Sequence, residues 1–154
     1  MHKVAAHPSA PERLFAQNHH GVYRSDDAGD TWISIADGLP ADFGFPIVVH
    51  PHEPTTVWVF PLVADGERFP PHGKARVWRS DDAGSSWTPS GRGLPDHFWT
   101  TVMRDAMTTD RADPAGLYLG ARDGTVFASL DGGDSWDQVA AHLPDVLCVR
   151  AAVF

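Results

Sequence analysis

Basic side chains recur at one position of the short apolar runs in this chain and are the first candidates for binding chemistry. Lys3, Arg104 and Arg150 share that position when four runs are aligned, and a proline fills it in the fourth run. Guanidinium groups match carboxylates through paired N–H donors, and an ammonium adds charge. Asp105 follows Arg104 and is expected on the opposite side of its strand. We therefore expect the three cations to hold an anionic group; the alternative is a solvated rim or salt bridges between neighbouring units.

A second pair of candidate residues stands at the end of the next apolar run. Asn18 and His19 stand where a predicted strand ends, and strand ends on a rigid scaffold often carry binding residues. They are therefore expected to contact a ligand. His7 and His50 each precede a proline in matching turns, which favours a structural role. No Cys/His spacing matches a zinc site, so the sequence predicts no metal and no cofactor.

The sequence leaves the catalytic residues unassigned. Tyr23 and Tyr118 occupy repeat positions that Trp and Phe fill elsewhere in the chain, which is typical of packing. Glu12 and Glu53 fall in proline-flanked turns and Glu67 in a loop. Spacing alone gives no pair of carboxylates for glycoside hydrolysis.

The elements that must position these residues are repeated three times. Three segments fit the pattern S-x-D-x-G-x-[ST]-W and are called boxes here: residues 25–32, 80–87 and 129–136. Each follows a Val-aromatic pair, and a Leu-Pro pair comes a few residues after each. A single match would be weak, but three copies with matching flanks define a repeat of about 50 residues.

Each box has a physical rationale as a tight turn. The Asp can accept hydrogen bonds from turn amides, and the Gly allows positive φ. The Ser or Thr can bond back across the turn, and the Trp can bury its ring between units. The residues assigned to these structural roles are Ser25, Asp27, Gly29, Trp32, Ser80, Asp82, Gly84, Trp87, Ser129, Asp131, Gly133 and Trp136.

The repeat predicts an all-β fold in a single segment, 1–154. Each unit reads as four short antiparallel strands with the box between the third and fourth, and this period is typical of a β-propeller blade. We expect blades at about 1–44, 45–100 and 101–145, then one closing strand at 146–154. Closed propellers have roughly four to eight blades. Three blades and a strand therefore predict either missing blades or self-association through open edges.

Composition excludes some partners. The net charge of −8 argues against nucleic acid and anionic membrane surfaces as partners. The first residues lack a secretory apolar core, and Cys148 is a lone cysteine, so a cytoplasmic location is expected. An insertion at 61–75 lengthens the middle hairpin of the second blade, where it is either a substrate-side element or a surface excursion.

The boxes resemble the Asp boxes, or bacterial neuraminidase repeats, of sialidases and the wider Asp-box propeller superfamily. Nearly the whole chain resembles the C-terminal part of such sialidase-like, glycosyl-hydrolase-like propellers, notably at 17–19, 43–46 and 149–153. In that superfamily the box is a fold element remote from the catalytic centre. Sialidases use an arginine triad, a Tyr nucleophile assisted by Glu, and an Asp acid/base. No residue here matches the motifs of that machinery, and 45–47 lacks the arginine of the family motif.

The resemblance therefore implies carbohydrate binding, or a relation to glycoside hydrolases, more than a reaction. The expected ligand is a carbohydrate or another small anion. Two alternatives stay open: a non-catalytic propeller that serves as a scaffold for a protein partner, and an inactive fragment of a larger propeller.

Overall fold

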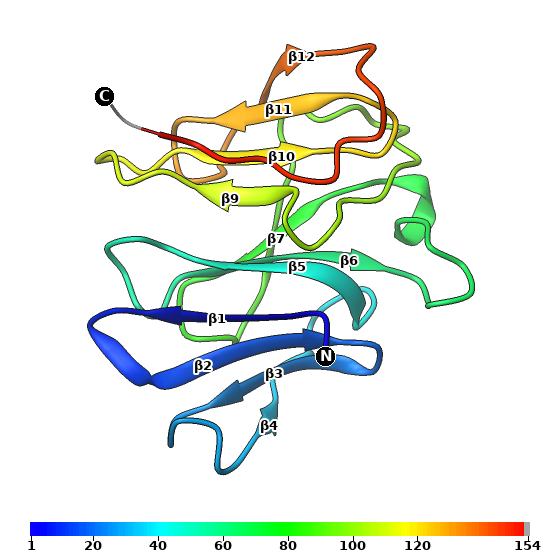
Figure 1. The fold of residues 1–154 in the computed structure, drawn as a ribbon. Coiled ribbons are helices and arrows are strands. Elements are labelled where there is room, and N and C mark those ends of the chain that lie inside the picture. Colours follow the sequence, from blue (N-terminus) through cyan, green and yellow to red (C-terminus); the bar gives the residue numbers. More distant parts are fainter. Residues whose placement is uncertain (153–154) are drawn as a thin grey trace.

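The computed structural model describes residues 1–152, which form three four-stranded antiparallel sheets (Figure 1). In each sheet the strands neighbour one another in chain order. The sole helical element among these residues is the short 3₁₀ turn η1 (Pro71–Gly73), and no helix has the length and apolar character needed to span a bilayer.

Sheet 1 contains β1 (Lys3–His7), β2 (Ala10–Asn18), β3 (Gly21–Ser25) and β4 (Ile33–Ser34). Sheet 2 contains β5 (Phe43–Val49), β6 (Val57–Leu62), β7 (Val77–Ser80) and β8 (Thr88–Ser90). Sheet 3 contains β9 (Met107–Thr109), β10 (Leu117–Gly120), β11 (Val126–Ser129) and β12 (Asp137–Ala140).

The predicted all-β architecture of three four-stranded units is therefore confirmed. The sheets stack face to face, with sheet 2 between sheets 1 and 3 (Figure 1). β6 is buried along its whole length because both of its faces are covered. Its alternate side chains serve two different cores: Val57 and Val59 pack toward sheet 1, whereas Trp58 and Phe60 pack toward sheet 3. The hydrophobic cores thus lie between sheets.

Each box closes the hairpin between the third and fourth strands through the same hydrogen bonds. In the second box Asp82 accepts from the Ser80 hydroxyl at 2.8 Å, the Ser86 amide at 2.8 Å and the Ser86 hydroxyl at 2.7 Å. The Gly84 amide donates to Ser80 Oγ at 2.7 Å. Asp27 and Asp131 make the same set of bonds in their boxes. These bonds hold the pKa of all three carboxyls at about 2, against the opposing effect of burial.

The box glycine permits both the turn and close contact with the neighbouring sheet. Gly84 has φ 87°, a conformation that side chains disfavour. A Cβ on Gly84 would also lie 2.4 Å from Ile35 Cδ1 in sheet 1. Any other residue here would therefore force the Ile35 side chain to shift.

The box tryptophans fill the spaces between sheets. Trp87 is 8% exposed and donates to the Ile35 carbonyl at 2.7 Å; Trp136 is 2% exposed and lies 3.3 Å from Ser90 Oγ. Trp32 has no preceding sheet among the described residues, is only half-buried, and bonds to the Gly29 carbonyl of its own box. The same residue therefore has two environments, set by whether a sheet precedes it.

The closing strand expected at 146–154 differs from the prediction. The described part makes one parallel bridge, between Asp105 and Cys148, and the Val149 amide donates to the Asp105 carbonyl at 2.9 Å. It is not a regular strand because no second strand within residues 1–152 pairs with its other edge. Val153 and Phe154 lie outside the described residues.

The two environments predict unequal costs of truncation. Trp87→Ala should lower the free energy of unfolding by about 3–5 kcal/mol, because it empties a closed inter-sheet site. Trp32→Ala should cost below about 2 kcal/mol, since its ring is partly in water already. Urea unfolding followed by circular dichroism measures both, and equal losses would contradict this assignment of the interfaces.

The box carboxylates predict acid sensitivity. A folded pKa of about 2 lies below the unfolded value of ~3.9, so each ionised carboxylate stabilises the fold fully above pH ~4. That contribution is lost as pH falls through about 2. The difference in unfolding free energy between wild type and Asp82→Asn should therefore shrink between pH 4 and pH 2. A difference that stays constant over this interval in urea titrations would rule out the proposed bonding.

Candidate functional site

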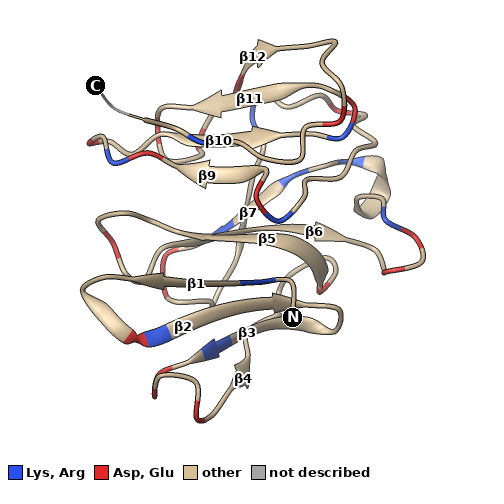
Figure 2. Ribbon diagram, viewed as in Figure 1, with Lys and Arg blue, Asp and Glu red and all other residues tan. Residues whose placement is uncertain are grey.

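The sequence-predicted cations gather at the end of the sheets where β1 begins and where β2, β6 and β10 finish. Figure 2 shows that most acidic residues lie in connecting segments rather than within strands. Lys3 Nζ donates to the Arg104 carbonyl at 2.8 Å and lies 3.8 Å from Asp105 Oδ1. Arg150 reaches the same carboxylate at 3.7 Å and the Asp105 carbonyl at 3.2 Å. Lys3 and Arg150 thus converge as expected, but their charges meet the Asp105 carboxylate of the chain itself rather than an open site.

This arrangement differs from the sequence expectation in two respects. Asp105 points toward the cations rather than away from them, because the segment before β9 is not a strand. The register also pairs Ala5 with Phe15 and Thr108 with Tyr118. The repeat position of Lys3 therefore falls on Ala106 in sheet 3, two residues after Arg104. Burial lowers the pKa of Lys3, and the Asp105 carboxylate opposes that shift.

Arg104 joins a different group, centred on Phe45. Its guanidinium carbon lies 5.4 Å from the Phe45 ring centroid, and that of Arg68 lies at the same distance. Arg68 pairs with Asp65 at 2.7 Å. No carboxylate of the described chain lies within salt-bridge distance of the Arg104 guanidinium. Arg104 is therefore the cation here whose charge is open to a ligand.

His19 lies beside this group. Its ring contacts that of His2 at 4.3 Å between centroids, and its Nε2 lies 3.6 Å from Asp65 Oδ2. His2 packs 4.8 Å from Phe45 and bonds through Nδ1 to the Gly44 carbonyl at 2.7 Å. Burial lowers the pKa of His2, and the neighbouring positive charges of His19 and Arg104 add to that effect.

Asn18 is not brought to this group. Its Oδ1 accepts the His20 amide at 2.6 Å and so stabilises its own hairpin turn. Its side chain helps to line a hollow on the outer face of sheet 1, together with Tyr23 and Trp32. Asn18 and His19 are adjacent in sequence but lie on different sides of the sheet, as strand alternation requires.

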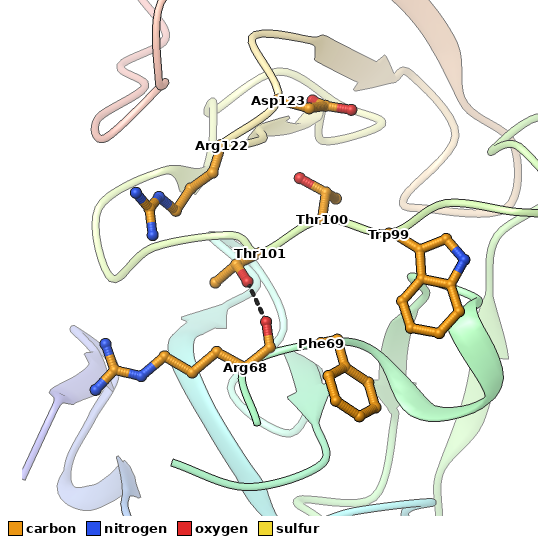
Figure 3. A pocket seen from close by; sticks show the side chains of 7 residues that line it. All are labelled: Arg68, Phe69, Trp99, Thr100, Thr101, Arg122 and Asp123. Atoms are coloured by element: carbon orange, nitrogen blue, oxygen red, sulfur yellow. Dashed lines mark hydrogen bonds between the residues drawn. The ribbon is translucent and has the colours of Figure 1, made fainter. Parts of the chain in front are cut away.

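The feature of this end that sequence analysis missed is an aromatic pair beside a cavity of about 330 Å³. Trp99 is 63% exposed, Phe69 is 36% exposed, and their ring centroids lie 5.5 Å apart. Figure 3 shows the two rings on one side and Arg68 and Arg122 on the other. The Thr101 hydroxyl between them donates to the Arg68 carbonyl at 2.7 Å. The remaining residues that line the cavity are Thr100 and Asp123.

The insertion at 61–75 positions this pair. The Phe98 amide donates to the Gly73 carbonyl at 3.0 Å, and the Ala75 amide donates to the Phe98 carbonyl at 3.1 Å. Gly73, in η1, has φ 65°, and a Cβ there would lie 2.4 Å from Trp99 Cζ2. The indole of Trp99 therefore rests on a bare glycine of the insertion. The insertion therefore takes part in forming the cavity, which Arg68 and Phe69 help to line.

The other polar candidates make hydrogen bonds within the protein. His7 and His50 accept main-chain amides within their own turns, Ser9 at 3.1 Å and His52 at 3.1 Å, which agrees with the predicted structural role. Tyr118 donates to Asp110 at 2.7 Å, and this bond raises the pKa of the phenol. Among residues 1–152 no cluster of His, Cys, Asp and Glu could hold a metal ion.

Comparison with known proteins extends the fold assignment. No protein-family model and no curated protein matches this sequence. Among solved structures, the GH74 xyloglucanase of Xanthomonas campestris aligns with a TM-score of 0.65 and 23% identity, over 88% of this chain and 20% of the enzyme. An ancestral GH74 enzyme aligns with a TM-score of 0.67 and 20% identity, over 92% and 18%. A structure of YCF48 bound to D1 peptide aligns with a TM-score of 0.56 and 11% identity, over 92% and 44%.

These similar structures are β-propellers, and the present chain spans about a fifth of the two GH74 enzymes and under half of YCF48. The three stacked sheets are therefore blades of a partial β-propeller. At these identities the likeness shows the fold alone.

The Asp105 pairing generates a prediction. Asp105→Asn should leave Lys3 and Arg150 without their carboxylate and so strengthen binding to an anionic matrix. Asp96→Asn makes the same change in net charge at a side chain that is 92% exposed and 3.7 Å from Arg76. On a heparin column Asp105→Asn should elute at higher salt than Asp96→Asn. Identical elution would show that the two cations do not form a common site.

Proposed function

We propose that this chain belongs to an Asp-box propeller of the sialidase-like superfamily and binds a carbohydrate at the end formed by Trp99, Phe69 and the arginines. The exposed Trp99 carries the proposal. An indole that is 63% exposed, and held in place by Gly73 and Phe69, contributes little to the core. Large exposed aromatic surface beside a hollow is typical of a ligand site.

The chemistry of the cavity suits a sugar. Pyranose rings present C–H faces that pack on an indole, and their hydroxyls need several donors and acceptors nearby. Thr100, Arg122 and Asp123 supply these groups around the cavity. An anionic substituent would lie toward Arg104, whose charge is unpaired, because Arg68 and Arg122 already pair with Asp65 and Asp145. The similarity to xyloglucanases in fold supports a carbohydrate ligand without identifying it.

The proposal is binding rather than hydrolysis. Two-carboxylate hydrolysis needs a pair of acidic side chains across the scissile bond. Within the described chain, Asp123 is the one carboxylate that lines the cavity. We assign no catalytic residue.

A protein-binding scaffold is the second candidate function. One structure of similar fold, YCF48, was solved with a bound D1 peptide, which supports peptide binding on a propeller of this kind. The same aromatic pair could receive an apolar peptide side chain. The two functions are distinguished by whether a carbohydrate or a peptide binds at Trp99.

A glycan array, with follow-up titration calorimetry, tests the proposal. We expect oligosaccharide binding that falls about tenfold or more in Trp99→Ala, because the stacking surface is lost. Leu130→Ala, a side chain that is 70% exposed in the third box, serves as the control and should bind normally. Glycan binding that is insensitive to Trp99→Ala would refute this site. Absent glycan binding, together with Trp99-dependent capture on a peptide array, would establish the scaffold function instead.

A further inference from the structure

Both internal interfaces between sheets are built from the same two faces. We call the side of each sheet that bears its box tryptophan the tryptophan face, and the side that bears Val22, Val77 or Val126 the valine face. The tryptophan face of sheet 2 packs on the valine face of sheet 1, and the tryptophan face of sheet 3 packs on the valine face of sheet 2. Two outer faces remain, one of each kind.

Directed hydrogen bonds accompany the burial at each internal interface. Between sheets 1 and 2, Trp87 Nε1 donates to the Ile35 carbonyl at 2.7 Å, and Arg24 donates to the Ala83 carbonyl at 2.8 Å. Between sheets 2 and 3, Arg79 donates to the Gly132 carbonyl at 3.2 Å, and the Trp136 amide donates to the Arg92 carbonyl at 2.8 Å. The interfaces therefore fix orientation as well as separation.

The tryptophan face of sheet 1 is uncovered within residues 1–152. Trp32 stands at the position of Trp87 and Trp136 but is half-buried, and Tyr23 is half-buried beside it. The two rings line a largely apolar hollow of about 210 Å³ together with Met1, Ala16 and Asn18.

The valine face of sheet 3 is covered only in part, because Val146 and Val149 lie against Gly120 while Val139 stays exposed. Counting from each box tryptophan, Val139 occupies the position of Ile35 and Ser90, although a bulge in β12 pairs Val126 with Ala140, whereas Val77 pairs with Ser90. Val139 is 59% exposed, whereas Ile35 and Ser90 are 5% and 8% exposed. Both of those residues bond to the tryptophan of the following sheet. Val139 therefore presents the acceptor side of an inter-sheet contact that has no donor within the described chain.

We propose that a second copy of this chain supplies the partner, with the tryptophan face of its sheet 1 docked on the valine face of sheet 3. Continuity with the two internal interfaces carries this inference, because the exposed halves repeat the halves that are already joined. In the docked pair Trp32 Nε1 donates to the Val139 carbonyl, as Trp87 does to Ile35. The contact is head-to-tail, so the two surfaces differ, and the pair as a whole keeps one free tryptophan face and one free valine face unless a ring closes.

Two features make this contact weaker than the internal interfaces. Ala128 stands where Arg24 and Arg79 bond across to the next box, so one directed bond is missing. Residues 146–152 run along sheet 3 where the incoming β1 would dock, so β1 has to displace them, including Val146 and Val149 from Gly120. Their described side-chain hydrogen bonds are those of Arg150 to the Asp105 and Val149 carbonyls. We therefore expect reversible association that depends on concentration.

Size-exclusion chromatography with light scattering, over a concentration series, tests the proposal on the full chain. Wild type should form dimers or larger species as concentration rises. Trp32→Lys and Val139→Lys add the same charge to opposite faces, and each alone should stay monomeric. Mixing the two variants should restore a dimer, because one intact tryptophan face and one intact valine face remain. Leu130→Lys, at an exposed side chain of the third box, is the control and should associate as wild type does.

The other outcomes would overturn the proposal. A wild type that stays monomeric throughout refutes self-association, and a mixture that stays monomeric refutes the head-to-tail pairing. Association abolished by Trp32→Lys but not by Val139→Lys would indicate a symmetric contact between two tryptophan faces. Circular dichroism confirms folding, and Tyr23→Lys, on the same face, replaces Trp32→Lys if that variant fails to fold. Glycan binding through Trp99 lies elsewhere on the molecule, so its success or failure is independent.

Discussion

The structure depends on one buried geometry, in which a box tryptophan enters the space between two sheets while a carboxylate fixes the turn before it. The Asp of each box accepts three hydrogen bonds, from a serine hydroxyl and from the amide and hydroxyl of one downstream residue. Those bonds set the turn, the turn sets where the fourth strand starts, and the tryptophan just before that strand meets the preceding sheet. The inter-sheet distance follows, because a glycine leaves room for the neighbour at that point.

This constraint explains why the fold could be predicted from the sequence. Box spacing gave three sheets, and the residues between the boxes gave strands at nearly the observed places, because both follow from local turn chemistry and strand alternation. The end of the chain could not be predicted so well, since a strand needs a partner and residues 146–152 find one bridge only. β9 begins only at Met107, so Arg104 precedes the strand and does not share the register of Lys3, as the alignment of apolar runs had predicted.

The candidate site was harder to predict because it depends on how segments without regular structure meet. Charge pattern alone brought Lys3 and Arg150 together correctly but could not show Asp105 between them. Trp99 gave no periodic signal. Its ring is positioned by contact with Gly73, which lies in the insertion of the same sheet. The composition of that insertion had marked it as a candidate, and the aromatic run at 97–99 was the signal that could have completed the site.

The most direct test of the central geometry is native-state hydrogen exchange at the box amides, followed by NMR. If the carboxylate and serine bonds hold the turns, these amides should exchange slowly and similarly in all three boxes, although they lie outside regular strands. Exchange at the rate of an unstructured loop in any of the three boxes would contradict the account. The amides to follow are those of Gly29, Thr31, Gly84, Ser86, Gly133 and Ser135.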